Sequence, residues 1–525
     1  MFARCRDLVI RPGWRGTGLL LLCLALLGLY TAHNRFPYFY HTDEPGKVAQ
    51  LVKGERNFHH PQLMLLATEA AARLLGMEWT EQSLVQVGRW YSAVCSTLAV
   101  AGLVLLTARL GSWGAAFLAG IAAGLHPLLF ELSHYMKEDC GLLFGVVWTL
   151  LALDWFVAKP TLARAAVAGG MAGVAVSAKY VGIFAAAAAL IAIVVVMLRR
   201  EGGRSAAIRG GVFVLAAIAA FALINLEALL APAEAKTGLS GEFRQMDRMA
   251  AKHSLIQTNY LAKIPRKIAP PLLIGAAGYL AFVVFGRRRR TATEWALVGF
   301  TFAYLASIHF TPLAKDRYLL PVLMMMCVMA ALGARELSIM ARRRRWSREW
   351  VNRGTAAAFV AVLAWQIPAL AGYAVEFSHD SRREMVEWVR RNLPPEAVIA
   401  YDSVVGFSRS GGVLDIPQRT IRPGRLVSDL GGLEKWREMG ITHVIVARHA
   451  WGNVFKRNDR PGSKYWPHRQ VYESLFHEGE LLWESDPGEL LYLHPGIRIY
   501  AIGTSAPPVN AGPPPAAPAG DAASG

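Results

Sequence analysis

Long apolar segments recur through the first 373 residues, and polar residues are largely confined to the short stretches between them. Each segment approaches the length of about 20 residues that an α-helix needs to cross a bilayer. The pattern predicts a polytopic α-helical membrane protein with about eleven spans. The expected spans are residues 17–34, 84–108, 112–132, 140–158, 162–178, 180–198, 208–230, 268–286, 293–311, 317–335 and 354–373.

The pattern changes after residue 373. Helical spacing at 381–392 is followed by short apolar runs, such as 397–401 and 443–447, and helix and strand signals then alternate to about residue 502. This alternation predicts a small α/β domain over residues 374–503, attached to a membrane domain over 1–373. Residues 504–525 are rich in Pro, Ala and Gly, and we expect them to form a disordered tail.

Composition supports a membrane protein. Hydrophobic residues make up 54% of the chain and charged residues only 18%, whereas a soluble protein carries about 25% charged residues. These values argue against a disordered chain, a coiled coil and an ordinary soluble enzyme.

The net charge of +18 informs topology. A basic chain can bind nucleic acid, but here the densest Arg clusters lie in short segments beside the expected spans: Arg199–Arg209, Arg287–Arg290 and Arg342–Arg348. Positive charge beside spans stays on the cytoplasmic side. We therefore expect a membrane partner and no nucleic-acid partner.

Eleven spans with a cytoplasmic N-terminus place every Arg cluster inside. They place residues 35–83, 133–139, 231–267 and 312–316 outside the cytoplasm, together with the α/β domain. The first span then acts as an uncleaved signal anchor. Frequent Ala, Arg and Gly suggest a bacterial source, so the expected location is a bacterial inner membrane.

Ionisable residues collect in the turns expected outside. The first turn holds Asp43 and Glu44, and the later ones carry Lys137, Glu138, Asp139, Lys179, Arg317 and Tyr318. Charged groups beside spans are costly and are functional candidates by default. An acid can take a proton from a hydroxyl, and cations can hold a phosphate. The turns predict one polar site at the outer face that acts on a lipid-linked sugar phosphate.

Four motifs, in order along residues 17–335, carry a family resemblance. They are His41-Thr42-Asp43-Glu44-Pro45 with His60-Pro61, Ser133-His134 with Asp139, Ser177-Ala178-Lys179-Tyr180, and Arg317-Tyr318-Leu319-Leu320-Pro321. The arrangement resembles GT-C glycosyltransferases. The most similar families are the protein O-mannosyltransferases and the bacterial aminoarabinose and lipopolysaccharide-core sugar transferases.

The resemblance implies a reaction and roles. A hexosyl or pentosyl group would move from a polyprenyl-phosphate donor to the hydroxyl of a glycan, lipid or protein acceptor, with inversion. Asp43, with Glu44 beside it, would act as the base. Asp139 and Glu138 would form a second acidic motif. The donor phosphate would meet His60, Lys137, Lys179, Arg317 and Tyr318. His60 stands where the aminoarabinose transferases carry a Lys.

Three alternatives stay open. No cofactor is certain, but Asp43, His59, His60 and Asp139 are candidate ligands of a divalent metal. The chain is alternatively a transporter or flippase of lipid-linked sugars, with Asn225 and Glu227 as its nearest polar candidates inside a span. In a third hypothesis, the membrane domain serves only as an anchor and the α/β domain, residues 374–503, carries the function.

Overall fold

The computed structural model describes residues 13–34, 39–250, 259–286, 288–309, 315–345, 347–405, 416–421, 424–457, 461–490 and 492–503. The chain forms two compact units. The membrane unit comprises Met1–Phe36 and Gly46–Gly372, and the C-terminal unit comprises Pro37–Pro45 and Tyr373–Gly525. The expected disordered tail, 504–525, lies outside the described residues, as does most of the expected outer turn 312–316.

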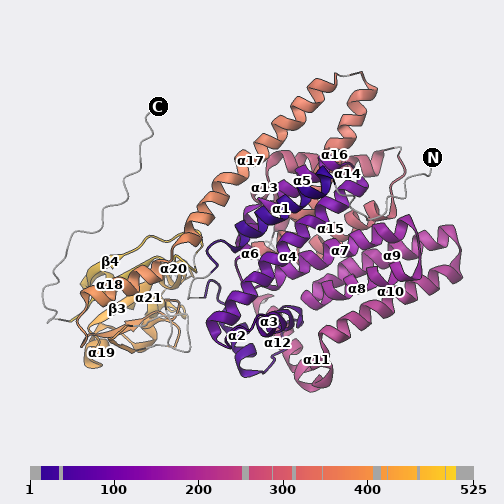
Figure 1. The fold of residues 1–525 in the computed structure, drawn as a ribbon. Helices are drawn as coiled ribbons and strands as arrows, with labels where there is room; N and C mark the ends of the chain where they lie inside the picture. Colours follow the sequence, from indigo (N-terminus) through magenta and orange to yellow (C-terminus); the bar gives the residue numbers. More distant parts are fainter. Residues whose placement is uncertain are drawn as a thin grey trace. The chain divides into compact units, whose positions relative to one another are not determined.

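The membrane unit is helical, and its long helices run alongside one another (Figure 1). Helix α7 packs against α4 and α8, α8 against α10, and α14 against α16. The helices are α1 Trp14–Thr31, α2 Glu44–Lys53, α3 Leu63–Leu74, α4 Glu81–Leu110, α5 Trp113–Gly124, α6 Pro127–Ser133, α7 Glu138–Ala158, α8 Leu162–Ala178, η1 Tyr180–Gly182, α9 Ile183–Arg200, α10 Gly203–Ile224, α11 Leu226–Leu230, α12 Pro232–Ala250, α13 Tyr260–Lys267, α14 Pro270–Phe285, α15 Ala292–His309, η3 Asp316–Leu319, α16 Leu320–Arg343 and α17 Arg348–Ser378.

The polytopic helical fold is confirmed, and the count of eleven spans stays a prediction. Among the described residues, seven helices are long and apolar enough to cross a membrane, or up to eight if a bent pair counts as one span. Every expected range contains a helix, but α8 and α14 have only 17 and 16 residues. The sequence pattern detects apolar helices without fixing which of them reach both membrane surfaces.

The bent pair is α5 and α6, which the sequence predicted as one straight span. The two helices meet at 60°. Pro127 begins α6, and His126 before it is extended, with φ −70° and ψ 124°. A proline disfavours helical backbone at the preceding residue and lacks an N–H for the helix, so the chain breaks at this point.

Small residues let α8 approach its neighbours closely. A Cβ added to Gly169 would lie 2.1 Å from the carbonyl oxygen of Phe213 on α10, and one on Gly145 of α7 would lie 2.5 Å from Cα of Ala175. Such contacts place helix backbones against each other, as is common between membrane helices.

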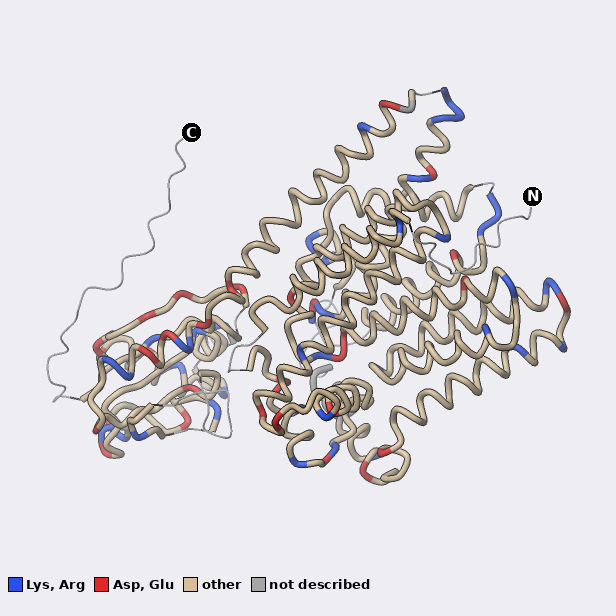
Figure 2. The backbone as a smooth tube through the Cα atoms, viewed as in Figure 1, with Lys and Arg blue, Asp and Glu red and all other residues tan. Residues whose placement is uncertain are grey.

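Charged residues of the membrane unit gather near helix ends (Figure 2). At one end Arg109 of α4 pairs with Asp154 of α7. At the same end Arg290 lies 3.3 Å from both Glu294 of α15 and Glu336 of α16. The residues expected to face outside occupy the opposite ends of α7 and α16. The unit therefore has two polar rims separated by apolar helix.

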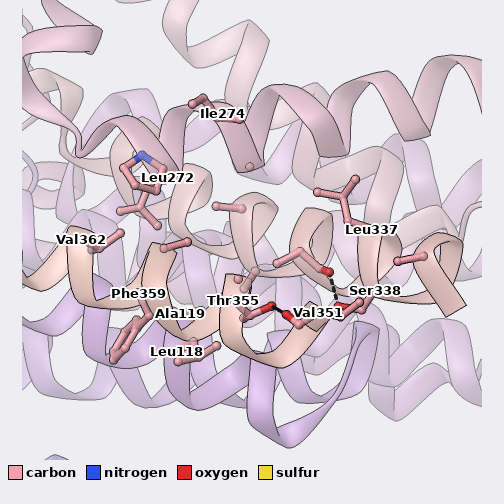
Figure 3. A pocket seen from close by; sticks show the side chains of 18 of the residues that line it. Leu118, Ala119, Leu272, Ile274, Leu337, Ser338, Val351, Thr355, Phe359 and Val362 are labelled. Atoms are coloured by element: carbon pink, nitrogen blue, oxygen red, sulfur yellow. Dashed lines mark hydrogen bonds between the residues drawn. The ribbon is translucent and has the colours of Figure 1, made fainter. Parts of the chain in front are cut away.

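An apolar pocket of about 930 Å³ lies between α5, α14, α16 and α17 (Figure 3). Its lining on α17 runs from Trp350 to Val362, or about 18 Å along the helix axis. Arg344 and Ser347 line the pocket where the chain turns from α16 into α17. We call this cavity the apolar pocket below.

The C-terminal unit contains a five-stranded sheet of order β2-β1-β3-β5-β4. Strand β1 pairs parallel with β2 and β3, whereas β5 pairs antiparallel with β3 and β4. Helices and sheet enclose a core around the fully buried Trp436. The elements are α18 Ser381–Asn392, β1 Val398–Tyr401, β2 Arg419–Ile421, η4 Val427–Leu430, α19 Leu433–Glu438, β3 His443–Ala447, α20 Arg448–Arg457, α21 Trp466–Glu478, β4 Glu480–Glu484 and β5 Ile497–Ala501.

The α/β character predicted for this region is confirmed. Every helix and strand expected there is present, whereas β2 and α20 escaped the sequence pattern. Residues 37–45, more than 300 positions earlier in the chain, also belong to this unit. No feature of the sequence predicted this.

Candidate active site

The first acidic loop, residues 39–45, presents its two acids differently. The Glu44 carboxylate is fully buried and its Oε2 accepts hydrogen bonds from the backbone N–H of Tyr40 at 2.6 Å and of His41 at 3.3 Å. The Asp43 side chain is 41% exposed. Glu44 therefore closes the turn, while Asp43 is accessible to a reactant.

His41 lies beside Asp43 in this loop. The backbone N–H of Asp43 donates to His41 Nδ1 at 3.1 Å, and Asp43 Oδ2 lies 3.8 Å from the same nitrogen. The acceptor role of Nδ1 in this bond corresponds to a ring unprotonated at that nitrogen. Helix α2 begins directly after Asp43, with Pro45 in its first turn, where a missing N–H costs nothing.

Asp139 is the centre of a buried group in the membrane unit. Its Oδ1 lies 2.8 Å from Lys179 Nζ, and its Oδ2 lies 3.9 Å from Arg317 Nε. Lys179 Nζ also stands 4.5 Å from the centre of the Tyr318 ring, a cation–π contact. Three predicted turns, far apart in sequence, thus meet at one carboxylate.

Glu138, the preceding residue, gathers a second set of cations. Lys47 Nζ lies 2.7 Å from its Oε1 and donates to the carbonyl of Met136 at 3.0 Å. His60 and Lys137 also interact electrostatically with the Glu138 carboxylate. The structure therefore brings together Lys137, Glu138, Asp139, Lys179, Arg317 and Tyr318, with His60 at the edge of the group; we call this set with Lys47 the cation cluster.

Local backbone geometry explains how two of the lysines reach the cluster. Helix α8 ends at Ala178, and Lys179 is extended before the short helix η1. A Cβ on Gly182 would lie 2.3 Å from the carbonyl of Ala175, so only glycine fits this tight turn. Lys137 begins α7, and Ser92 Oγ hydrogen-bonds both its N–H and its carbonyl at 3.3 Å.

The cluster carries an excess of positive charge. Lys47, Lys137, Lys179 and Arg317 interact with the two carboxylates of Glu138 and Asp139, and Arg317 also interacts with the Glu131 carboxylate. In this set four cations meet three carboxylates. A buried excess of positive charge favours an anion, such as a phosphate ester.

Lys47 is the member of the cluster to which the sequence analysis assigned no role. Its only signal is its place one helical turn after Glu44, and its partner Glu138 lies about ninety residues further on. Asp316 similarly pairs with Lys263 at 2.9 Å and Lys267 at 2.8 Å from α13. Neither pairing is visible in local sequence.

The residues proposed as metal ligands do not form a metal site in the part of the chain that the structure describes. No group of three or more His, Cys, Asp and Glu side chains there is arranged to hold an ion. Asp139 is engaged with Lys179, and the His59 backbone N–H is bound to Asn57 Oδ1 at 3.1 Å.

The two residues suggested for a transporter have evident structural partners. Asn225 Oδ1 accepts from the N–H of Gln62 at 2.8 Å, and its Nδ2 donates to Ser177 Oγ at 3.0 Å. Glu227 pairs with Arg56 at 2.9 Å. These bonds join α3, α8 and the end of α10 on the side of the cation cluster.

The most deeply buried acid of the sheet also has a structural explanation. Asp402 follows β1 and accepts hydrogen bonds from Val427 N, Ala447 N and the Tyr472 hydroxyl at 2.7–3.0 Å. Burial raises the pKa of Asp402 to about 6, although these three bonds oppose the shift. The carboxyl joins three segments at the end of the parallel strands and is closed to solvent.

Comparison with known proteins gives one family match in sequence. Residues 60–224 match the family described as dolichyl-phosphate-mannose-protein mannosyltransferase. This range is just under a third of the chain; it includes His60, Glu138, Asp139 and Lys179 but neither Asp43 nor Arg317. No curated protein matches the chain.

Solved structures match over nearly the whole length. ArnT from Cupriavidus metallidurans, bound to undecaprenyl phosphate, is 14% identical with a TM-score of 0.51, over 94% of this chain and 99% of that one. The Archaeoglobus fulgidus oligosaccharyltransferase AglB, in complex with an inhibitory peptide and a dolichol-phosphate, is 13% identical with a TM-score of 0.54, over 95% and 75%. An Archaeoglobus fulgidus oligosaccharyltransferase in complex with Zn and sulfate is 13% identical with a TM-score of 0.54, over 90% of this chain and 72% of that one.

These comparisons confirm the fold class predicted from the sequence, a polytopic helical membrane protein of GT-C type. Within that class, the resemblance in sequence is to the dolichyl-phosphate-mannose-protein mannosyltransferases and is confined to residues 60–224.

Proposed function

We propose that this protein transfers a sugar from a polyprenyl-phosphate donor to an acceptor hydroxyl in one inverting step. Asp43 takes the hydroxyl proton, and the acceptor oxygen attacks the anomeric carbon. The bond from that carbon to the phosphate oxygen breaks, and its electron pair leaves with the phosphate. A phosphate is a good leaving group, so the step needs a base and positive charge more than an acid.

The observation that carries this proposal is the positive excess of the cation cluster. Lys179 and Arg317 come from two different turns of the chain, and both contact the Asp139 carboxylate. A lysine side chain offers three N–H donors and an arginine side chain five, so each can bind more than one oxygen. They can therefore meet the charge that develops on the departing phosphate.

Covalent geometry links the proposed base to this cluster. Asp43 is four residues before Lys47 in the chain, and four residues span at most about 14 Å even when fully extended. The proposal assigns proton transfer to Asp43 and leaves Glu44 to hold the loop, because the Glu44 carboxylate is committed to two backbone N–H groups.

A polyprenyl donor also needs apolar surface for its tail, and the apolar pocket offers it. The first residue of α16 that lines the pocket, Cys327, is ten residues after Arg317, or about 15 Å along a helix. Much of the pocket lining comes from α14 and α16. We assign the distal part of the tail to the apolar pocket.

We further propose that the cation cluster faces the outside of a bacterial inner membrane and that the N-terminus is cytoplasmic. The two polar rims support this assignment, since the Arg-rich rim would lie on the cytoplasmic side. The acceptor would then be a glycan, lipid or protein of the cell envelope.

The rival proposal, a flippase of lipid-linked sugars, has less support. Transporters concentrate polar groups near the bilayer midplane. In the described part of the membrane unit, the cation cluster lies at helix ends, and the apolar pocket is lined mainly by Ala, Leu and other apolar residues.

The decisive experiment compares envelope lipids and glycans by mass spectrometry in strains carrying wild-type protein, no protein, Asp43→Asn or Glu55→Gln. Glu55 is an exposed acid of the same outer segment and serves as the matched control. We expect the deletion and Asp43→Asn to lose one sugar from an envelope product, with initial rates in membranes reduced about 10²- to 10⁴-fold for Asp43→Asn. Glu55→Gln should match wild type. If Asp43→Asn retains wild-type product while the deletion loses it, Asp43 is not the base and transport becomes the better explanation.

A further inference from the structure

The first acidic loop is built into the C-terminal unit. The Arg382 guanidinium donates through Nη1 to the carbonyl of Phe39 at 3.0 Å. The Tyr40 ring packs on Phe377 with centroids 5.6 Å apart, and His41 contacts the edge of Tyr492 at 4.8 Å. Three consecutive residues of the loop are therefore held by α17, α18 and the segment before β5.

Arg382 is the polar centre of these contacts. Its side chain and that of Asp380 are both fully buried, which is rare for charged groups. Arg382 Nε lies 2.8 Å and 3.2 Å from the two Asp380 carboxylate oxygens, and Nη2 completes a forked pair with Oδ2. Asp380 also caps α18 by accepting from the Arg382 N–H at 2.9 Å.

The fork fixes the direction of the remaining donor. With Nε and Nη2 engaged by Asp380, Nη1 is held toward Phe39, four residues before Asp43. A lysine has one nitrogen in place of the planar guanidinium, so it cannot keep the forked pair and reach the Phe39 carbonyl together. The loop conformation thus depends on a geometry that only arginine supplies.

We propose that Arg382 is a positioning residue for the transferase reaction and that the C-terminal α/β domain, through it, sets the conformation of the loop that carries the base. This inference rests on the proposed role of Asp43. Misplacing a reacting group by about 1 Å can cost about 10²-fold in rate. The domain therefore contributes to turnover itself and is not only a binding module for the acceptor.

The neighbouring arginine is a natural control. Arg383 lies on the same helix, is 58% exposed, and pairs with the exposed Glu387 at 3.3 Å. Exposed pairs of this kind contribute little. Arg382→Lys and Arg383→Lys make the same chemical change at adjacent positions. Arg382 is hydrogen-bonded to the loop, whereas Arg383 lies on the surface.

The test uses the full-length protein in detergent with a synthetic polyprenyl-phosphate sugar as donor and the acceptor identified from the envelope analysis. We expect Arg382→Lys to lower kcat by about 10- to 100-fold while the KM for the donor stays within about twofold. Arg383→Lys should match wild type in both. Equal kcat for the two variants would overturn the inference.

Hydrogen exchange separates positioning from unfolding. We expect faster exchange at residues 39–45 in Arg382→Lys, with the central strand β3, residues 443–447, protected as in wild type. If β3 also loses protection, Phe377→Leu replaces Arg382→Lys in the test, because it loosens the loop at Tyr40 without leaving a buried charge unpaired. Unchanged kcat in a folded Phe377→Leu protein would count against the inference.

A double variant distinguishes the two proposals. If Arg382 acts through Asp43, Arg382→Lys should lower the residual activity of Asp43→Asn by less than about twofold. An effect as large as in the wild-type background would show that Arg382 acts independently, which overturns the inference and leaves the base assignment intact. Full activity of Asp43→Asn alone would instead refute the base, and the Arg382 inference with it.

Discussion

The Asp139–Lys179 pair bears both on stability and on the proposed transfer step. The Asp139 side chain is 4% exposed and that of Lys179 is 17% exposed, so neither charge is well hydrated. Removing one partner of a buried pair leaves the other uncompensated, at a cost of about 3–5 kcal/mol, whereas removing both can be nearly neutral. Loss of activity in a single variant would therefore be ambiguous.

A pair of substitutions resolves this ambiguity. We expect Lys179→Met to lower both the thermal midpoint in detergent and the transfer rate. Lys179→Met combined with Asp139→Asn should recover most of the thermal midpoint, because no charge is left unpaired, yet remain at least about 10²-fold slower than wild type. Lys159→Met, at an exposed position just after α7, is the control. Recovery of transfer in the double variant would mean that Lys179 only neutralises Asp139.

At the residue scale, the sequence predicted which residues belong to the candidate site better than it predicted their interaction partners. The motif order correctly brought Asp139, Lys179 and Arg317 together, because motifs in successive outer turns must share one side of the membrane. It named Asp43 as the base only through the family resemblance, since adjacent acids look equivalent in a sequence. Only the folded loop shows that the Glu44 carboxylate accepts hydrogen bonds from backbone N–H groups, while the Asp43 side chain stays exposed.

At the scale of elements, helix α17 lines the apolar pocket, so substitutions on this helix can test what the pocket binds. Ala358 lines the pocket, and its neighbour Ala357 is exposed and does not. If the pocket holds the donor tail, Ala358→Trp should displace part of the tail and raise the KM for a long-chain donor about tenfold, given about 0.8 kcal/mol per buried methylene. Ala357→Trp should leave it unchanged.

A donor with a short prenyl chain checks the cause of that effect. Its KM should not respond to Ala358→Trp, because a short tail would not extend from the cation cluster to the pocket. An equal rise for long and short donors, or for both tryptophan variants, would show that the pocket does not hold the tail. Kinetics with purified protein in detergent measure all four combinations.

Element predictions succeeded where the apolar pattern was long and failed where backbone geometry decided the outcome. The apolar run 112–132 gave no warning that Pro127 would turn the chain through 60°. Polar helices such as α2 and α12 were missed, because they lack the long apolar runs on which the span predictions rest. In the C-terminal region, the alternation of helix and strand signals predicted most elements but missed β2 and α20.

For the whole molecule, the two polar rims of the membrane unit lead to a test of orientation. We expect Glu55→Cys to react with a membrane-impermeant maleimide in intact spheroplasts, and Arg204→Cys to react only after permeabilisation. Both positions are exposed, and the parent chain with its five native cysteines is the control. Labelling in the reverse order would place the cation cluster in the cytoplasm.

The assignment of the first acidic loop to the C-terminal unit bears on how such enzymes recombine. A chimeric chain that exchanged only residues 373–503 with a homologue would receive an α/β domain shaped for another loop. Residues 39–45 would have to be exchanged together with the domain, although more than 300 residues separate the two in sequence. Natural variants are therefore expected to change at Arg382 and in the loop together, so that a new acceptor specificity in the domain is inherited with a loop matched to it.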